Sequence, residues 1–330
     1  MKDYVGIVTT LKAPVEDVLR FVNWHINLGV DHLFLFFDDP DDKAIPQLKG
    51  NNHLTCIRCD TAYWASLGVP RGDAHYIRQR INATHCLKMA SERQLTWLFH
   101  IDIDELLFAK EGLHPALLAA GDADQIILSP MEAVPELLRG GEPFTSSRFF
   151  RVLPHPVCRG LFVFWAALLG IGRFTLNRRF INNKSFIIKG RYFNGHESGK
   201  SGSRLSKEIV EIKIHHPVFR SSDIRRYRPK DLVLLHFESY RFKEWERKME
   251  RWMGQDWSQQ KRSRVLRPQL VRFKRILEQP PEMRLKLKQK LYKRFYFINP
   301  VQRFILHAMG MLQRIDLDPR LFGPPSPKKK

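Results

Sequence analysis

The chain contains little cysteine. Its 330 residues include four cysteines, too few for a fold of this size to depend on disulfide bridges. Cys56 and Cys59 form one C-x-x-C pair and Cys86 follows His85, but no second pair lies at the spacing of a four-ligand zinc site. We therefore expect small buried side chains in a reducing compartment rather than a zinc centre.

Long apolar segments are also missing. The longest run, at 161–172, is about a dozen residues, whereas a membrane-spanning helix needs about 20. Residues 1–10 lack the apolar stretch of a secretory signal, and Asp3 interrupts them. These absences predict a cytoplasmic protein in which no segment spans a membrane.

Acidic residues are scarce in the second part of the chain. Residues 151–330 carry 14 Asp and Glu against 41 Lys and Arg, whereas residues 1–150 carry 20 against 14, and the formal net charge is +21. A basic excess of this size indicates a polyanionic partner: nucleic acid, an anionic membrane surface or a phosphorylated substrate.

Residues 1–130 alternate between two hydrophobic periodicities. Helical spacing predicts a helix at 14–28, closed by Gly29, and a second at 73–93, opened by Asp73. Short apolar or β-branched runs predict strands at 4–10, 32–37, 54–59, 95–101 and 125–129. This alternation is typical of an α/β fold, with a mostly parallel sheet that helices cover on both faces.

Beyond residue 140 the pattern is weaker. A helix is expected at 238–253, and one or two basic amphipathic helices at 283–313, broken by Pro300. Strand-like runs lie at 186–193, 208–216 and 231–237. We therefore predict three parts: an α/β domain over 1–240, a basic helical extension over 241–322 and a disordered tail over 323–330.

Acidic side chains follow three of the predicted strands. They are Asp38 with Asp39, then Asp60, and finally Asp102 with Asp104. In sheets of this class, ligands bind at the carboxyl ends of the strands. The sequence therefore predicts a ligand site that these strand ends share.

The segment HIDIDELL, at 100–107, carries the strongest motif. In an extended chain Asp102 and Asp104 lie on one side, and Glu105 adds a third acid after a buried strand. Mg²⁺ or Mn²⁺ is commonly held by one or two carboxylates together with phosphate oxygens, which a nucleoside diphosphate supplies. A phosphatase-type D-x-D is the nearest alternative, but it normally follows the first strand.

Two stretches resemble the signatures of a known family. FVNWHINLGVDHLFLFFDDPDD, at 21–42, and WLFHIDIDELL, at 97–107, are similar to bacterial family 2-like glycosyltransferases of the family 92 (domain of unknown function 23) type. The resemblance implies a GT-A, Rossmann-like fold, a nucleotide-sugar donor, a divalent metal and transfer with inversion. The family's Asn-Glu pair after the first strand is absent, since TTLKAP stands there at 9–14.

Further positions receive roles from this resemblance. His236 matches a late histidine that completes the metal shell beside Asp102 and Asp104, with His196 as the competing metal ligand, and a hydrogen-bonded core histidine is the equal alternative. Nucleotide-sugar contacts are expected from Asp38, Asp39, Gln79, Arg80 and His196. An inverting transfer also needs a general base, for which Glu132 and Glu197 are the candidates to test.

The basic segment 283–313 interleaves Lys and Arg with Leu, Phe, Tyr and Ile, which suits an anionic membrane surface. The leading hypothesis is therefore a metal-dependent glycosyltransferase at the inner face of the membrane, acting on a glycan or lipid-linked acceptor in envelope polysaccharide synthesis. No nucleic-acid partner is expected, because the predicted site at Asp102 and Asp104 lies in the acidic part of the chain, residues 1–150, which would repel a phosphate backbone. A nuclease or nucleic-acid-binding protein, and a non-catalytic membrane adaptor, are the alternatives.

Overall fold

The computed structural model describes residues 3–72, 74–135, 148–152, 198–254, 263–308 and 310–324. The chain divides into two compact units. Unit 1 comprises residues 1–130, 197–236 and 318–330, and unit 2 comprises residues 131–196 and 237–317. Neither unit is continuous in sequence, whereas the predicted domains 1–240 and 241–322 are, and that division stays a prediction.

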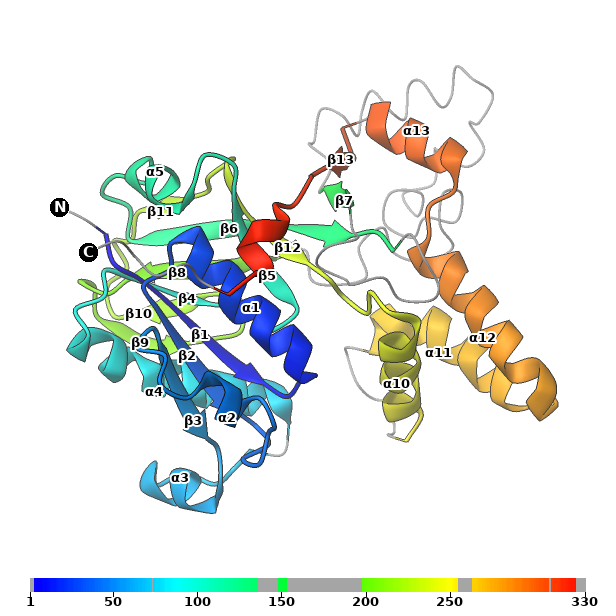
Figure 1. Ribbon diagram of the computed structural model, residues 1–330, viewed down its shortest axis with the longest axis horizontal. Coiled ribbons are helices and arrows are strands. Elements are labelled where there is room, and N and C mark those ends of the chain that lie inside the picture. The colour runs from blue at the N-terminus through cyan, green and yellow to red at the C-terminus, as the bar shows by residue number, and fades with distance from the viewer. Residues whose placement is uncertain are drawn as a thin grey trace. The chain divides into compact units, whose positions relative to one another are not determined.

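Unit 1 is built on a mostly parallel sheet (Figure 1). Its strands run in the order β3-β2-β1-β4-β8-β6, and β8 alone in this series is antiparallel to its neighbours. Their bounds are β1 Val5–Leu11, β2 His32–Phe37, β3 Leu54–Arg58, β4 Trp97–His100, β8 Lys200–Arg204 and β6 Gln125–Ala133. The α/β fold class predicted from the sequence is confirmed.

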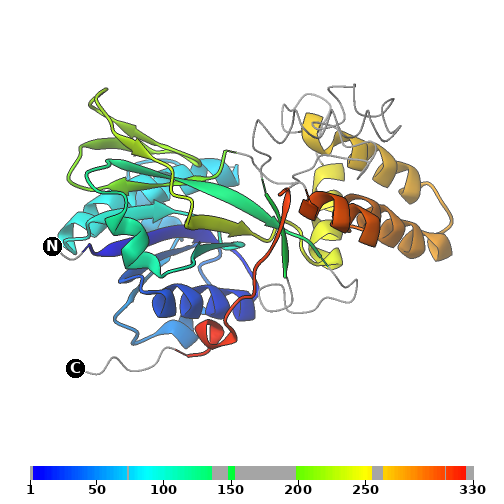
Figure 2. The same cartoon turned by 90° about the horizontal axis from the view of Figure 1, so that it is seen from above.

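Two helices cover opposite faces of this sheet, as Figure 2 shows. They are α1, Val15–Leu28, and α4, His75–Glu92. Every residue of β1 and β2 is buried, which is the expected result for strands that are covered on both faces. Helix α1 ends as predicted at Gly29, whose φ of 107° lies in the left-handed region that favours glycine.

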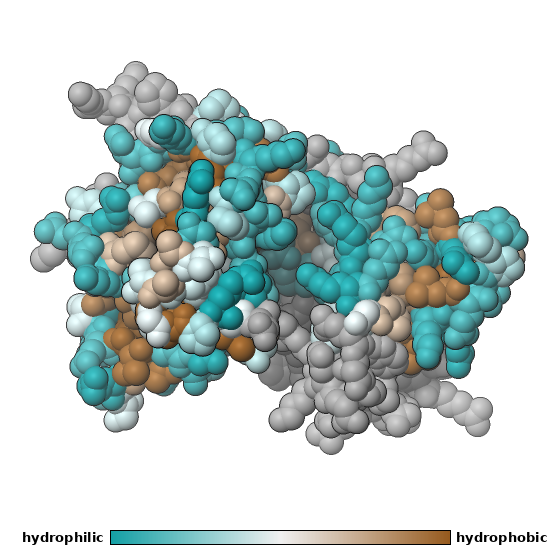
Figure 3. Space-filling model, turned by 90° about the horizontal axis from the view of Figure 1, so that it is seen from below, coloured by the Kyte–Doolittle hydropathy of each residue, from teal (hydrophilic) through white to brown (hydrophobic). Residues whose placement is uncertain are grey.

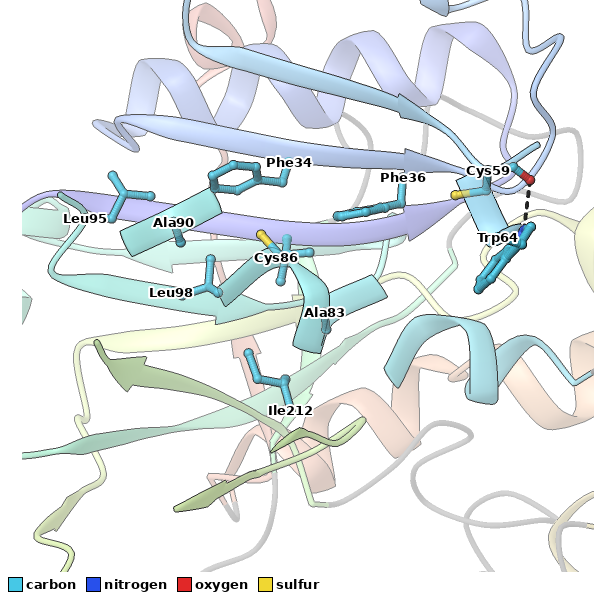
Figure 4. Packing of buried hydrophobic residues seen from close by; sticks show 11 residues of the cluster. Phe34, Phe36, Cys59, Trp64, Ala83, Cys86, Ala90, Leu95, Leu98 and Ile212 are labelled. Carbon is cyan, nitrogen blue, oxygen red and sulfur yellow. Dashed lines mark hydrogen bonds between the residues drawn. The ribbon is translucent and has the colours of Figure 1, made fainter. Parts of the chain in front are cut away.

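The face below α4 is packed closely (Figure 4). Ala83, Cys86 and Ala90 of the helix are fully buried against Phe34 and Phe36 of β2. Small side chains on the helix leave room for the aromatic rings of the sheet. Of the three free cysteines in the described part, Cys59 and Cys86 are buried and Cys56 is half-buried.

The other elements of unit 1 surround this core. Strand β5, Glu105–Ala109, pairs antiparallel with β12, Leu232–His236. The turn η1, Pro319–Phe322, returns to α1, where Phe322 stacks on Trp24. The smaller elements are α2 Ile45–Leu48, α3 Thr61–Ser66, α5 Leu113–Leu118, β9 Ile209–Ile212, β10 Pro217–Phe219 and β11 Arg226–Tyr227.

Unit 2 contains the predicted C-terminal helical region. Its helices are α10 Phe242–Met253, α11 Ser263–Leu277, α12 Pro281–Tyr296 and α13 Pro300–Ala308. Trp245, Met249, Phe273, Tyr292 and Tyr296 form its core, each at most 1% exposed. The predicted break at Pro300 is observed, since α13 begins there.

Three elements of unit 2 were not expected. Helix α11 was not predicted, and the end of the predicted helical segment 283–313 is a strand, β13, Leu312–Arg314. This strand pairs antiparallel with β7, Phe149–Val152, and β7 also pairs with Met131 to Ala133 of β6. The pairing explains the difference, because the partner strand lies far away in the sequence. The strand predicted at 186–193 and the apolar run 161–172 lie outside the described residues.

Within the described part of the chain, no helix is both long and apolar enough to cross a membrane.

Candidate functional site

The acidic segment between β4 and β5 is a tight turn. The backbone N–H of Asp102 donates to the Glu105 carboxylate at 2.7 Å, and the backbone N–H of Glu105 donates to the Asp102 carbonyl at 3.0 Å. The sequence predicted an extended segment with both aspartates aimed at one point. These two hydrogen bonds fold the chain back, and the aspartates are bonded to different groups.

Asp102 is bonded to groups within the protein. One of its carboxylate oxygens accepts from Gln79 at 2.6 Å, and the other lies 2.9 Å from Nζ of Lys200. The Lys200 side chain is only 2% exposed, and its Nζ also lies 3.7 Å from Glu105. Buried charges of this kind persist only when they are paired, so the acids and the lysine stabilise one another.

The pKa values of Asp102 and Glu105 shift in opposite directions. Burial alone raises the pKa of Asp102, but the charges of Lys200 and His100 outweigh it and hold that pKa well below its usual range. For Glu105 burial is the stronger influence, and it raises the pKa to about 7 although Lys200 opposes it. Asp102 is therefore ionised at neutral pH, whereas burial shifts the pKa of Glu105 in the opposite direction.

The position of Lys200 depends on the glycine before it. Gly199 has a φ of 68°, and a Cβ there would lie 1.9 Å from the carbonyl oxygen of Leu128. Only glycine lets β8 begin this close to β6. Because Ser201 pairs with His100, the lysine then lies beside the carboxyl end of β4, where the acidic turn begins.

Asp104 is paired differently. Its carboxylate lies 3.6 Å from Nε2 of His236, at the carboxyl end of β12, and the two ligand atoms are within 4.8 Å of one another. The Asp104 side chain is 44% exposed and that of His236 is 10% exposed. One carboxylate oxygen and one imidazole nitrogen on an accessible edge are suitable ligands for Mn²⁺ or a similar divalent cation.

The Trp-His pair of the first signature stretch holds the strand that follows the acidic turn. Nε1 of Trp24 donates to the Leu107 carbonyl at 2.7 Å, and the Leu107 N–H donates to Nε2 of His25 at 3.2 Å. Nδ1 of His25 lies 2.7 Å from the Phe21 carbonyl, which makes it the protonated nitrogen. Burial lowers the pKa of His25 to about 3, so the ring is neutral. The two signature stretches thus meet at Leu107.

The acids after β2 are also engaged. Asp38 accepts two hydrogen bonds from Arg78, at 2.6 and 2.7 Å, and lies 3.3 Å from Arg71. Burial raises the pKa of Asp38, but hydrogen bonds from His75 and Arg78 outweigh it and hold the pKa well below its usual range. Asp39 is more accessible, and its partner is Lys12 at 3.1 Å.

The other residues predicted for the site differ in their surroundings. Gln79 belongs to the site through Asp102, whereas Arg80 is bonded to Glu211. Glu132 lies in unit 2, 1% exposed, in an ion pair with Arg151 at 2.5 Å. His196 and Glu197 lie outside the described residues.

Two residues of this region escaped the sequence analysis. Lys200 lies in a Gly- and Ser-rich stretch, where a lysine is ordinarily an exposed loop residue, and nothing in the sequence connects it with Asp102. Arg78 was passed over in favour of Gln79 and Arg80, the positions with a family likeness. The one local signal was the position of Arg78 in the first turn of α4, near the strand ends.

The site thus has an acidic turn, a histidine and a buried lysine at the carboxyl ends of strands in an α/β unit. Comparison with known proteins adds a relationship at low identity. No family model matches the chain. A glycosyltransferase-like protein of Arabidopsis thaliana is 22% identical over an alignment of 173 residues that covers 46% of this chain. The chain spans 38% of the length of that relative.

Solved structures match only weakly. HddC from Yersinia pseudotuberculosis is 11% identical and covers 76% of this chain and 100% of its own, with a TM-score of 0.33. The mannosyltransferase Ktr4p from S. cerevisiae is 8% identical and covers 44% of this chain and 41% of its own, with a TM-score of 0.26. Matches at this level do not bear on the function of the chain.

Proposed function

We propose that the protein is a metal-dependent glycosyltransferase that takes a sugar from a nucleoside-diphosphate donor. The observation that carries the proposal is the Asp104–His236 pair at the carboxyl ends of β-strands, next to an acidic turn held in place by Trp24 and His25. The relationship to a glycosyltransferase-like protein supports the same class.

Asp104 and His236 fit a divalent cation by donor type and exposure. When bound, Mn²⁺ or Mg²⁺ supplies Lewis-acid stabilisation of the departing nucleoside diphosphate. Gln79 donates to Asp102 and so orients the turn that carries Asp104. Asp39, which is more exposed than Asp38, is the better of the two candidates for hydrogen bonds from the nucleoside.

The proposal includes inversion at the transferred sugar, and therefore a general base. Glu132 does not suit that role, because its carboxylate is buried and held by Arg151. Glu197 remains the candidate base, and His196 and Arg80 remain candidates for contacts with the donor.

The proposed acceptor is a glycan or a lipid-linked sugar at the inner face of a membrane, in envelope polysaccharide synthesis. Unit 2 carries 30 Lys and Arg against 11 Asp and Glu, whereas unit 1 carries 25 against 23. The basic excess therefore belongs to the unit without the acidic turn. This division favours a surface-binding role for unit 2 over a nuclease, which would need basic side chains along the catalytic unit.

A thermal-shift screen tests the proposal. UDP, GDP, CDP and dTDP are each added with and without Mn²⁺, and we expect one of them to raise the Tm only when Mn²⁺ is present. Asp104→Asn and His236→Asn should lose that shift, and Asp122→Asn, at a side chain 79% exposed, is the matched control that should keep it. A chain that responds to none of the four nucleotides with metal is not a transferase of this class.

A further inference from the structure

We infer that the ammonium group of Lys200 is the cation that pairs with Asp102 and Glu105. The divalent metal is then held by Asp104 and His236, without Asp102. Lys200 is on this account a positioning residue. The inference deepens the proposed function and rests on it, because it concerns which residues of the acidic turn bind the metal.

The hydrogen bonds of the turn support this division. Both carboxylate oxygens of Asp102 have partners, Gln79 on one side and Lys200 on the other. Glu105 is bonded to the backbone N–H of Asp102 and lies 3.7 Å from Nζ of Lys200. A metal that bound Asp102 would have to compete with the Gln79 amide and the Lys200 ammonium group for its oxygens.

Burial supports it as well. The Lys200 side chain is 2% exposed, and that of Glu105 is 6% exposed, so neither group reaches solvent as a surface ion pair does. Asp104 is 44% exposed and faces His236. The Asp102 side chain is 30% exposed, so Asp102 and Glu105 differ from Asp104 mainly in being paired with Lys200, and Asp104 is the most accessible of the three carboxylates.

The charge of Lys200 has a second consequence. A fixed cation beside the acidic turn weakens the attraction of the turn for a divalent ion. Removing it should therefore raise the affinity for Mn²⁺ by about tenfold, because Asp102 becomes available as a ligand and the repulsion is lost. A lysine with a purely structural role would change stability and leave the metal affinity unaltered.

The experiment measures Mn²⁺ affinity of the full chain by titration, with the metal alone and with each of the four nucleoside diphosphates. We expect Asp102→Asn to retain the wild-type affinity within about threefold, and Asp104→Asn and His236→Asn to lose at least tenfold. Lys200→Met should bind about tenfold more tightly, and Lys200→Met/Asp102→Asn should return to the wild-type affinity.

Two comparisons keep the test decisive. If Lys200→Met does not fold because it leaves Asp102 unpaired, the double variant removes both charges and still reports on Asp104 and His236. Lys207→Met is the matched control, since Lys207 is 39% exposed and paired with Asp124 elsewhere in unit 1.

The failures are distinguishable. Loss of Mn²⁺ binding in Asp102→Asn equal to that in Asp104→Asn overturns the inference and leaves the proposed function intact. A wild-type chain that binds no Mn²⁺ under any of these conditions overturns both.

Discussion

At the scale of single residues, the acids of the chain differ by their partners. Asp102 and Asp38 have cations bonded to their carboxylates, whereas Asp104 faces a histidine on an accessible edge. Their side chains are chemically identical, so the difference comes entirely from what lies opposite each one. This distinction leaves Asp104 as the better candidate for the proposed metal and pairs Asp38 with Arg78.

The Glu132–Arg151 pair allows a test at the same scale. Both side chains are at most 1% exposed, and Arg151 also donates to the Tyr296 carbonyl at 2.7 Å. Arg151→Met should lower the free energy of unfolding by about 3–5 kcal/mol, because it leaves a buried carboxylate without its cation. Urea denaturation followed by tryptophan fluorescence measures the change.

The double variant Arg151→Met/Glu132→Gln should recover part of that loss, since it removes both charges. Arg314→Met, at a guanidinium 56% exposed, is the matched control and should change stability by less than about 0.5 kcal/mol. If Arg151→Met is as stable as the wild type, the pair contributes nothing to unit 2.

At the scale of elements, helix α12 combines a buried and an exposed face. Leu291, Tyr292, Phe295 and Tyr296 are buried, whereas Met283 is 45% exposed. Figure 3 shows, on the one face that it draws, hydrophobic side chains lying among hydrophilic ones in the helical part of unit 2. Exposed apolar groups beside lysines are the combination expected of a helix that binds an anionic bilayer.

This face predicts binding to anionic vesicles. Met283, Lys286, Lys290 and Lys293 recur at the spacing of one helix side and all are exposed. Lys286→Glu/Lys290→Glu should weaken binding to phosphatidylserine-containing vesicles by at least tenfold, because each lysine near such a surface contributes about 1 kcal/mol. Co-sedimentation with vesicles of phosphatidylserine and phosphatidylcholine measures it.

Two controls accompany the vesicle assay. Vesicles of phosphatidylcholine alone should bind neither form, and Leu118→Ser, at a side chain 69% exposed in unit 1, should bind like the wild type. Equal binding of the double variant and the wild type would exclude α12 as the membrane-binding surface.

At the scale of the whole molecule, charge and burial determine how stability depends on pH. His25, His32 and His100 are buried, and burial is the main reason that their pKa values fall from 6.5 to about 3, 4 and 4. In the unfolded chain each takes up a proton near pH 6.5. The contribution of these histidines to the free energy of unfolding should therefore be fully present above pH 6.5. It should be lost between pH 6.5 and 4, by up to about 1.4 kcal/mol per pH unit for each histidine.

Glu105 acts in the opposite direction. Its pKa rises from 4.5 to about 7 in the folded state, so its contribution is lost as the pH rises through that range. Because three histidines outweigh one acid, the free energy of unfolding should on balance fall as the pH falls. Urea denaturation at pH 8, 7, 6 and 5 measures how the free energy of unfolding changes with pH. His25→Gln should reduce that slope by the equivalent of about one bound proton. A variant with the wild-type slope would show that His25 is charged in the folded protein.

Local sequence was sufficient for much of this fold. The uninterrupted apolar runs of β1, β2 and β4 could be read as buried strands, and the helix at Val15–Leu28 followed from its periodicity and its glycine. The acids at 102–105 were located for the same reason, because they directly follow a buried strand. Each of these features depends on neighbours within a few residues.

The partner of each of those acids depends on the tertiary structure. Lys200 reaches Asp102 because β8 lies antiparallel beside β4, and His236 reaches Asp104 because β12 pairs with β5. These partners come from distant parts of the chain, and no local pattern encodes the strand order that brings them together. Local sequence places acidic residues directly after a buried strand, whereas the folded sheet sets the partner of each carboxylate and leaves Asp104 the most accessible.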